Sequence, residues 1–187
     1  MSGTDSQADP RQGAPARLGQ LRQIQVGFDA EHDRLLLRVN TSEKAELRFW
    51  LTRRIVKRLW PLLLGSLRSN EDVVTQPTPE RREAVLAFRH EGALSKSDFT
   101  QRFSEERACT PLGEEPILAT RARLDRAGTQ HRLALHPTKG QGVTLTFEEP
   151  VMHSFCELVR RAVRAADWDL ELPDLNAPPP TALGSAH

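Results

Sequence analysis

The sequence predicts an α+β protein made of two copies of one unit, in which a three-strand antiparallel meander is followed by a helix. Apolar positions of the first half recur without a gap in the second half, so that Val26 matches Ala122 and Ile55 matches Val151, 96 positions later. In each half the pattern has period two over three short segments and helical spacing after them. A long match in register is typical of a duplicated unit, and we expect the copies to pack around a pseudo-two-fold axis with a helical insert between them.

The first copy covers residues 22–68. Apolar and polar residues alternate in three segments that we predict as strands, 24–28, 35–39 and 45–51. Thr52 is a suitable N-cap for the helix that follows. Pro61 lies inside that helix, so we expect a kink there or a break after Trp60.

The second copy covers residues 116–171 and follows the same plan. Its predicted strands are 117–124, 131–136 and 143–148. Pro150 suits the first helical position, and we expect the helix to run to about Ala166.

Residues 69–115 form the predicted insert. Thr78 can cap a helix from Pro79 to about Glu91 that packs Val85 and Phe88 inward. We expect a second, short helix over 98–107 that holds Phe99 and Phe103, and connecting loops over 69–78 and 108–116.

The two ends of the chain are polar and proline-rich, and we expect them to be disordered arms. These are residues 1–21 and 172–187, which leave a single domain over 22–171. We expect a cytoplasmic protein, because residues 1–20 contain no apolar run, no segment is long enough to span a bilayer, and the two cysteines lack metal-like spacing. The formal net charge is only +1, so no global field attracts a polyanion.

No motif for phosphate binding, metal binding or nucleophilic catalysis is present, so we expect no enzyme activity, no cofactor and no metal. His153 lies three residues before Cys156 and could activate a thiolate, although a buried structural cysteine is the more common case. His90 and Glu91 could form an acid–base pair, although a solvated helix end explains them as well. An enzyme or a small-ligand binder is therefore the third option.

Alternation leaves arginine-rich side chains on the strand face opposite the helices. The predicted outward residues for partner binding are Arg34, Arg38, Arg48, Trp50, Arg121, Arg123, Arg132 and His136. Guanidinium groups and one tryptophan on a sheet suit phosphate contacts and base stacking. The insert could instead cover this face and pair its glutamates with the arginines, for example with Arg34 or Arg48.

A second basic stripe lies on the first predicted helix. It consists of Arg53, Arg54, Lys57 and Arg58. The sequence thus favours a non-enzymatic, intracellular binding or adaptor protein that acts through protein–protein contacts. The alternative is a protein that binds single-stranded nucleic acid through the arginine-rich sheet face, and the pattern leaves the oligomeric state open.

Overall fold

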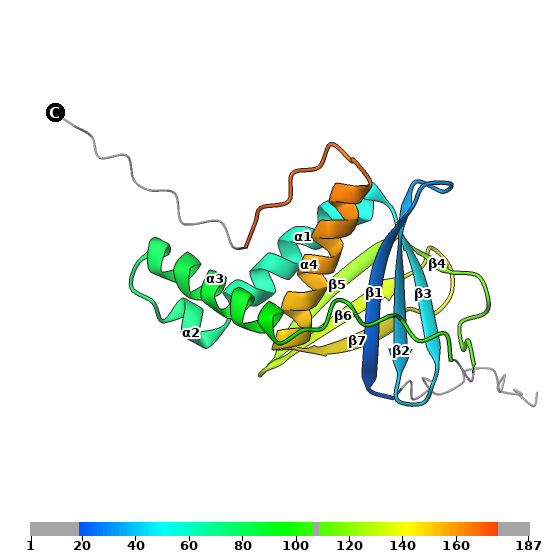
Figure 1. Ribbon diagram of the computed structural model, residues 1–187, viewed down its shortest axis with the longest axis horizontal. Helices are drawn as coiled ribbons and strands as arrows, with labels where there is room; N and C mark the ends of the chain where they lie inside the picture. The colour runs from blue at the N-terminus through cyan, green and yellow to red at the C-terminus, as the bar shows by residue number, and fades with distance from the viewer. Residues whose placement is uncertain (1–18, 107–108, 176–187) are drawn as a thin grey trace, which may run out of the picture.

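The computed structural model of the chain describes residues 19–106 and 109–175. It is an α+β fold in which the described residues form two sheets and four helices (Figure 1). Sheet 1 contains β1 (Leu21–Asp29), β2 (Arg34–Thr41), β3 (Glu46–Leu51) and β4 (Ile117–Ala119). Sheet 2 contains β5 (Arg121–Ala127), β6 (Gln130–His136) and β7 (Val143–Glu148).

The first three strands of each sheet form antiparallel meanders, as the alternating pattern predicts. The structure differs at 117–124, which is two strands and not one: β4 pairs in parallel with β3, and β5 begins sheet 2. Thr120 separates them, with its N–H donating to the His136 carbonyl over 2.8 Å. This segment therefore carries the chain from one sheet to the other. The first half runs β1–β2–β3–α1 and the second runs β4–β5–β6–β7–α4, so the duplication and its pseudo-two-fold axis remain predictions.

Two long helices follow the meanders, α1 (Arg53–Arg68) and α4 (Glu149–Ala165). Thr52 caps α1, because its Oγ1 accepts a hydrogen bond from the Ile55 N–H over 3.4 Å. The break predicted after Trp60 is wrong, since α1 continues through Pro61. The proline ring is exposed, and the opposite face of the helix is buried along Leu59, Leu63 and Leu67.

Each long helix packs mainly on a strand of the other half. In Figure 1, α4 lies along β1, and α1 lies along β5. Residues from both halves share one hydrophobic cluster, which includes Leu37, Leu47, Leu133 and Phe155. The inner face of sheet 1 is thus covered by α4, from the second half, and the inner face of sheet 2 by α1, from the first half.

The insert contains α2 (Glu71–Val74), in a stretch predicted as a loop, and α3 (Pro79–Ser95), which is capped by Thr78 and continues through Gly92. The expectation that Phe88 packs inward is wrong, since it is 77% exposed; Leu86 is the buried residue of that turn.

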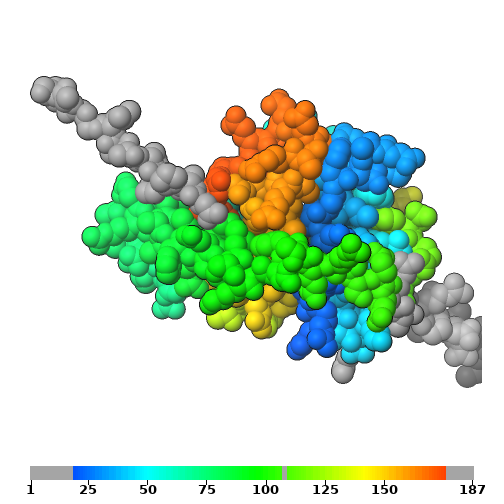
Figure 2. All heavy atoms as spheres, in the orientation of Figure 1, coloured from blue at the N-terminus to red at the C-terminus, as the bar shows by residue number. Residues whose placement is uncertain are grey.

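The helix predicted over 98–107 is also wrong within its described part. Residues 98–106, hereafter the strap, run without helical structure from the end of α3 across the outer side of sheet 1, as the green segment in Figures 1 and 2 shows. The helix-like spacing of Phe99 and Phe103 has another cause, because each ring lies under an arginine side chain from a different element: Arg161 lies over Phe99 at 4.6 Å and Arg38 over Phe103 at 4.3 Å.

The chain continues to pack on the core up to the last described residue. Trp168 is buried against Phe28 and donates a 2.7 Å hydrogen bond to Asp33, and Leu175 is buried too. Packing therefore extends into the predicted C-terminal arm, of which 176–187 lie outside the described residues, as do 1–18 of the N-terminal arm. No helix of the described ranges has both the length and the apolar character that crossing a membrane requires.

Candidate binding surface

The outer face of sheet 1 carries a row of alternating charges. Arg38 and Arg48 are neighbours across β2 and β3, and Glu46 lies between them with its side chain 1% exposed. Its Oε1 is 2.8 Å from the Arg38 Nε and 3.7 Å from the Arg48 Nε. Both arginines therefore share a buried carboxylate instead of standing free in solvent.

Two glutamates that follow α3 complete this row. Glu105, on the strap, lies 2.8 Å from Arg38, and Glu114 lies 3.1 Å from Arg48. The hydrogen bond to Glu105 raises the pKa of Arg38 above its usual value, with burial acting in the opposite direction. Of the two arrangements that the sequence allows, the structure has the one in which the insert covers these arginines.

The next row of the same face is apolar and is not crossed by the strap contacts. Register places Leu36, Trp50 and Leu118 side by side, with Gly27 at the β1 end. Leu118 is 38% exposed, and the His32 ring lies 5.0 Å from the Trp50 ring. Leu118 also lines a cavity of about 380 Å³, so the apolar row leads into a hollow. Arg34 is half-buried beyond this row, opposite Asp29.

The basic stripe on α1 divides between two sides of the helix. Arg54 and Arg58 line the 380 Å³ cavity, together with Leu118 and Ile55. Arg53 turns the other way and donates a 2.6 Å hydrogen bond to the Asp169 carbonyl. Lys57 lines a separate groove between α1 and residues 170–173. Arg54 and Arg58 are one i,i+4 pair, and Arg53 and Lys57 are the other. Each pair lies on its own side of α1, so the four cations do not form one continuous basic patch.

The outer face of sheet 2 holds the remaining predicted residues. Arg121, Arg123 and Arg132 are exposed there, and His136 is half-buried. Arg123 pairs with Asp125 at 2.9 Å on the same face. His136 packs on Gly142, where an added Cβ would lie 2.1 Å from the imidazole Nδ1, which explains the glycine in this turn. Trp50 is on the other sheet, so these arginines and the tryptophan do not share one face.

Of the residues considered for catalysis, His90, His153 and Cys156 are buried between helices, whereas Glu91 is exposed on α3. Cys156 is fully buried, and burial raises the pKa of its thiol, which disfavours a thiolate. His153 does not pair with it; its Nδ1 lies 3.1 Å from the Nδ1 of His90 on α3. Burial lowers the pKa of both imidazoles, that of His153 to about 4.

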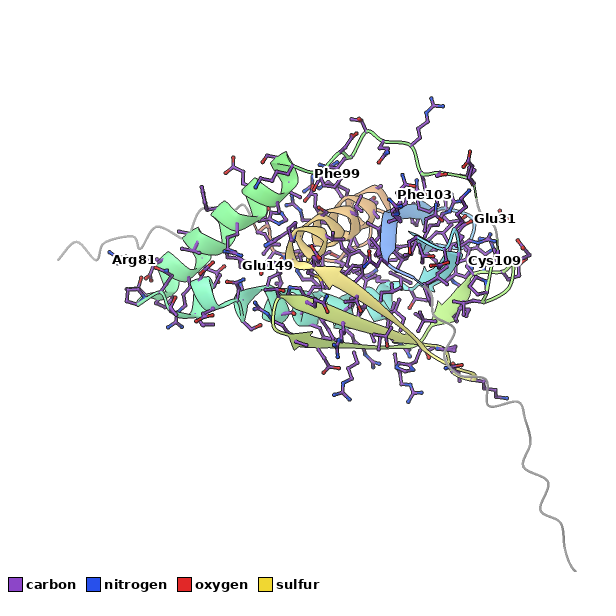
Figure 3. The ribbon with its side chains drawn as sticks, turned by 90° about the horizontal axis from the view of Figure 1, so that it is seen from below. Glu31, Arg81, Phe99, Phe103, Cys109 and Glu149 are labelled. Carbon is purple, nitrogen blue, oxygen red and sulfur yellow. The ribbon has the colours of Figure 1, made fainter. Side chains whose placement is uncertain are left out.

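A polar cluster that the sequence reasoning missed surrounds this pair. Glu149, labelled in Figure 3, contacts Arg89 at 2.8 Å and lies 3.9 Å from His153. Beyond it, Ser66 and the Nδ1 of His131 are 2.6 Å apart. Glu149 and His153 are four residues apart on α4, a spacing that could have indicated their contact, whereas Arg89, Ser66 and His131 come from distant segments that no local pattern connects to them. Across 19–106 and 109–175, no cluster of histidine, cysteine and carboxylate groups has an arrangement that could hold a metal ion.

A larger cavity, of about 530 Å³, lies along β7 and the start of β1, with Leu145 and Phe147 among the residues that line it. None of its lining residues was predicted as a binding residue. The chain matches no family model, and no curated protein or solved structure matches it.

Proposed function

We propose that this chain is a protein-binding module whose docking surface combines the apolar row of sheet 1 with the cavity beside α1. Leu118 carries this proposal, because it is exposed and belongs both to the row with Trp50 and to the cavity with Arg54 and Arg58. Interfaces of this kind combine an apolar centre, enriched in tryptophan and arginine, with a polar rim. The surface suits a partner segment that inserts an apolar side chain and carries acidic residues beside it.

Selection from a random peptide library on the full chain tests this proposal and does not require an identified partner. We expect the recovered peptides to combine an apolar residue with acidic ones, and Arg54→Glu to weaken their binding by at least about tenfold, because it reverses a contacting charge. The matched control is Arg81→Glu, which changes an exposed arginine on α3, away from this surface. Peptides that bind the two variants equally well would contradict the assignment.

Binding of single-stranded nucleic acid is the second candidate, supported by the open arginine face of sheet 2. Trp50 lies on sheet 1, so the ring beside these arginines is the half-buried imidazole of His136, opposite Arg121, which is a smaller platform for base stacking than tryptophan. Fluorescence anisotropy with labelled single-stranded DNA and RNA at about 50 and 200 mM salt separates the candidates, since phosphate binding falls steeply with salt. Salt-sensitive binding that is lost in Arg121→Ala/Arg132→Ala would favour nucleic acid over the protein-binding proposal.

A further inference from the structure

The strap lies on sheet 1 in the manner of a bound peptide. The side-chain amide of Gln23 makes two hydrogen bonds to its backbone, donating to the Arg102 carbonyl over 2.9 Å and accepting from the Ser104 N–H over 2.8 Å. Asn40 donates to the Ser104 carbonyl over 2.8 Å. Paired amide contacts of this kind hold any extended backbone, whatever its side chains.

Arg161 contacts the Phe99 ring of the strap, and Arg38 contacts two further strap side chains at once. The Arg38 guanidinium donates to both oxygens of Glu105, over 3.0 and 2.8 Å, and lies 4.3 Å above the centre of the Phe103 ring. A bidentate carboxylate contact and a cation–π contact on one guanidinium select an aromatic residue two positions before an acidic one. Figure 3 shows Phe103 above β1 and Phe99 beside α4.

The receptor side of this contact does not depend on the strap for its position. The Arg38 Nε is bonded to the buried Glu46 over 2.8 Å, which fixes the guanidinium. Gln23 and Asn40 project from β1 and β2, whose pairing lies within sheet 1. A preformed site loses less conformational entropy when it binds.

The ends of the strap region are held by other contacts. Ser97 bonds to Ser154 of α4 at 2.7 Å, and the Cys109 carbonyl accepts a 3.0 Å hydrogen bond from the Glu46 N–H. Between strap, β1 and α4 lies a cavity of about 380 Å³, so the strap is not tightly packed. Glu105 itself is 72% exposed. Segments with few buried contacts open at low cost relative to the core.

We propose that this face of sheet 1 is a peptide-binding site that the chain occupies in cis with Phe103-Ser104-Glu105, and that the partner it fits is an extended segment with the pattern Phe-x-Glu. We infer this pattern from the strap itself, whose Phe103 and Glu105 contact Arg38. A partner segment competes with the strap, which has the advantage of an intramolecular ligand. The strap is held by Gln23, Arg38 and Asn40, which belong neither to the apolar row nor to the cavity at Arg54, so failure of either proposal leaves the other standing.

A labelled peptide with the sequence of residues 98–106 tests the site in trans. We expect weak binding to the wild-type chain and binding at least about tenfold tighter to Phe103→Ala/Glu105→Gln, in which the cis ligand has lost its two side-chain contacts. Adding Gln23→Ala or Arg38→Gln to that variant should remove the gain. Gln23→Ala leaves the charges unchanged and keeps the test valid if Arg38→Gln disturbs folding.

Three results would overturn the proposal, and the first two concern the peptide itself. One is equal binding of the peptide to the wild-type chain and to the vacated variant. The other is equal binding of a control peptide that carries the same two substitutions. Peptide binding that is sensitive to Arg54→Glu and insensitive to Gln23→Ala would place the peptide in the cavity beside α1, against the site proposed here. Concentration-dependent dimers in which two chains exchange straps would support the site, with a second copy as the occupant.

Discussion

The outer faces of the two sheets start from similar sequence patterns and differ in what covers them. On sheet 1, Arg38 and Arg48 share the buried Glu46 and lie beneath residues that follow α3. On sheet 2, Arg121 and Arg132 face solvent, and Arg123 pairs with an exposed aspartate. An outward arginine on a strand therefore does not indicate a basic surface by itself. Its effect depends on carboxylates supplied from elsewhere in the chain, which alternation does not reveal.

The largest effect should come from removing the carboxylate under the covered face. Glu46→Ala leaves two arginines in part-buried positions with one counter-charge fewer, and we expect a loss of about 4 kcal/mol in the free energy of unfolding. Urea denaturation of the wild type and the variant measures it. A loss below about 1 kcal/mol would mean that the row of charges contributes little to stability.

Acid should weaken the packing of α3, in the insert, against α4, because the buried His90 and His153 meet there. His153 titrates at about 4 in the fold and at 6.5 in the unfolded chain, so the unfolded state binds more protons between these values. Stability is therefore complete above pH 6.5 and falls as the pH drops toward 4, by ~3 kcal/mol. Burial is the main cause of the low pKa of His153; His90, Arg89 and His131 add to this shift and Glu149 opposes it, while Glu157 opposes the corresponding shift of His90.

Chemical denaturation at a series of pH values measures this slope. His153→Gln should flatten it without abolishing it, because burial also lowers the pKa of His131. An unchanged slope in His153→Gln would assign the pH dependence to other groups.

Removing the aromatic contact of the strap should have a smaller effect. Phe103→Ala deletes a half-buried ring and its cation–π contact, and we expect a loss of about 1 kcal/mol. Hydrogen exchange provides a local readout, since the Ser104 N–H bonded to Gln23 should exchange faster while Glu46 N–H, bonded to Cys109, stays protected. An equal increase in the exchange rates of both amides would show that the strap and the segment around Cys109 open together.

Removing a carboxylate from the exposed outer face of sheet 2 should change the free energy of unfolding least of all. Asp125→Ala removes the partner of Arg123 where both side chains are more than half exposed, and we expect a change within about 0.5 kcal/mol. Urea denaturation next to the Glu46→Ala variant gives the comparison directly. A loss as large as that of Glu46→Ala would remove the distinction between the two faces.

Sequence patterns predicted the parts of this fold that depend on local spacing. Alternation located Leu37, Leu47 and Leu133 in the core, because a buried sheet face requires period two. The same reasoning misread Phe99 and Phe103 as a helical pair, since their spacing is equally compatible with an extended segment that meets two arginines. The pairing of Arg38 with Glu105 and of His90 with His153 joins residues more than 60 positions apart, which no local pattern encodes.

The packing of each long helix on the opposite half has a consequence for how the chain acquires its structure. The strand β1 leaves the ribosome long before the helix that covers it, α4 (Glu149–Ala165), because all the other strands and helices of the described residues lie between them in the sequence. Neither half can bury its apolar surface fully until α4 is available. Contacts of such long sequence separation slow folding and leave apolar surface exposed for longer. A nascent chain that ends before α4 should therefore remain unfolded and depend on chaperones until α4 has been synthesised.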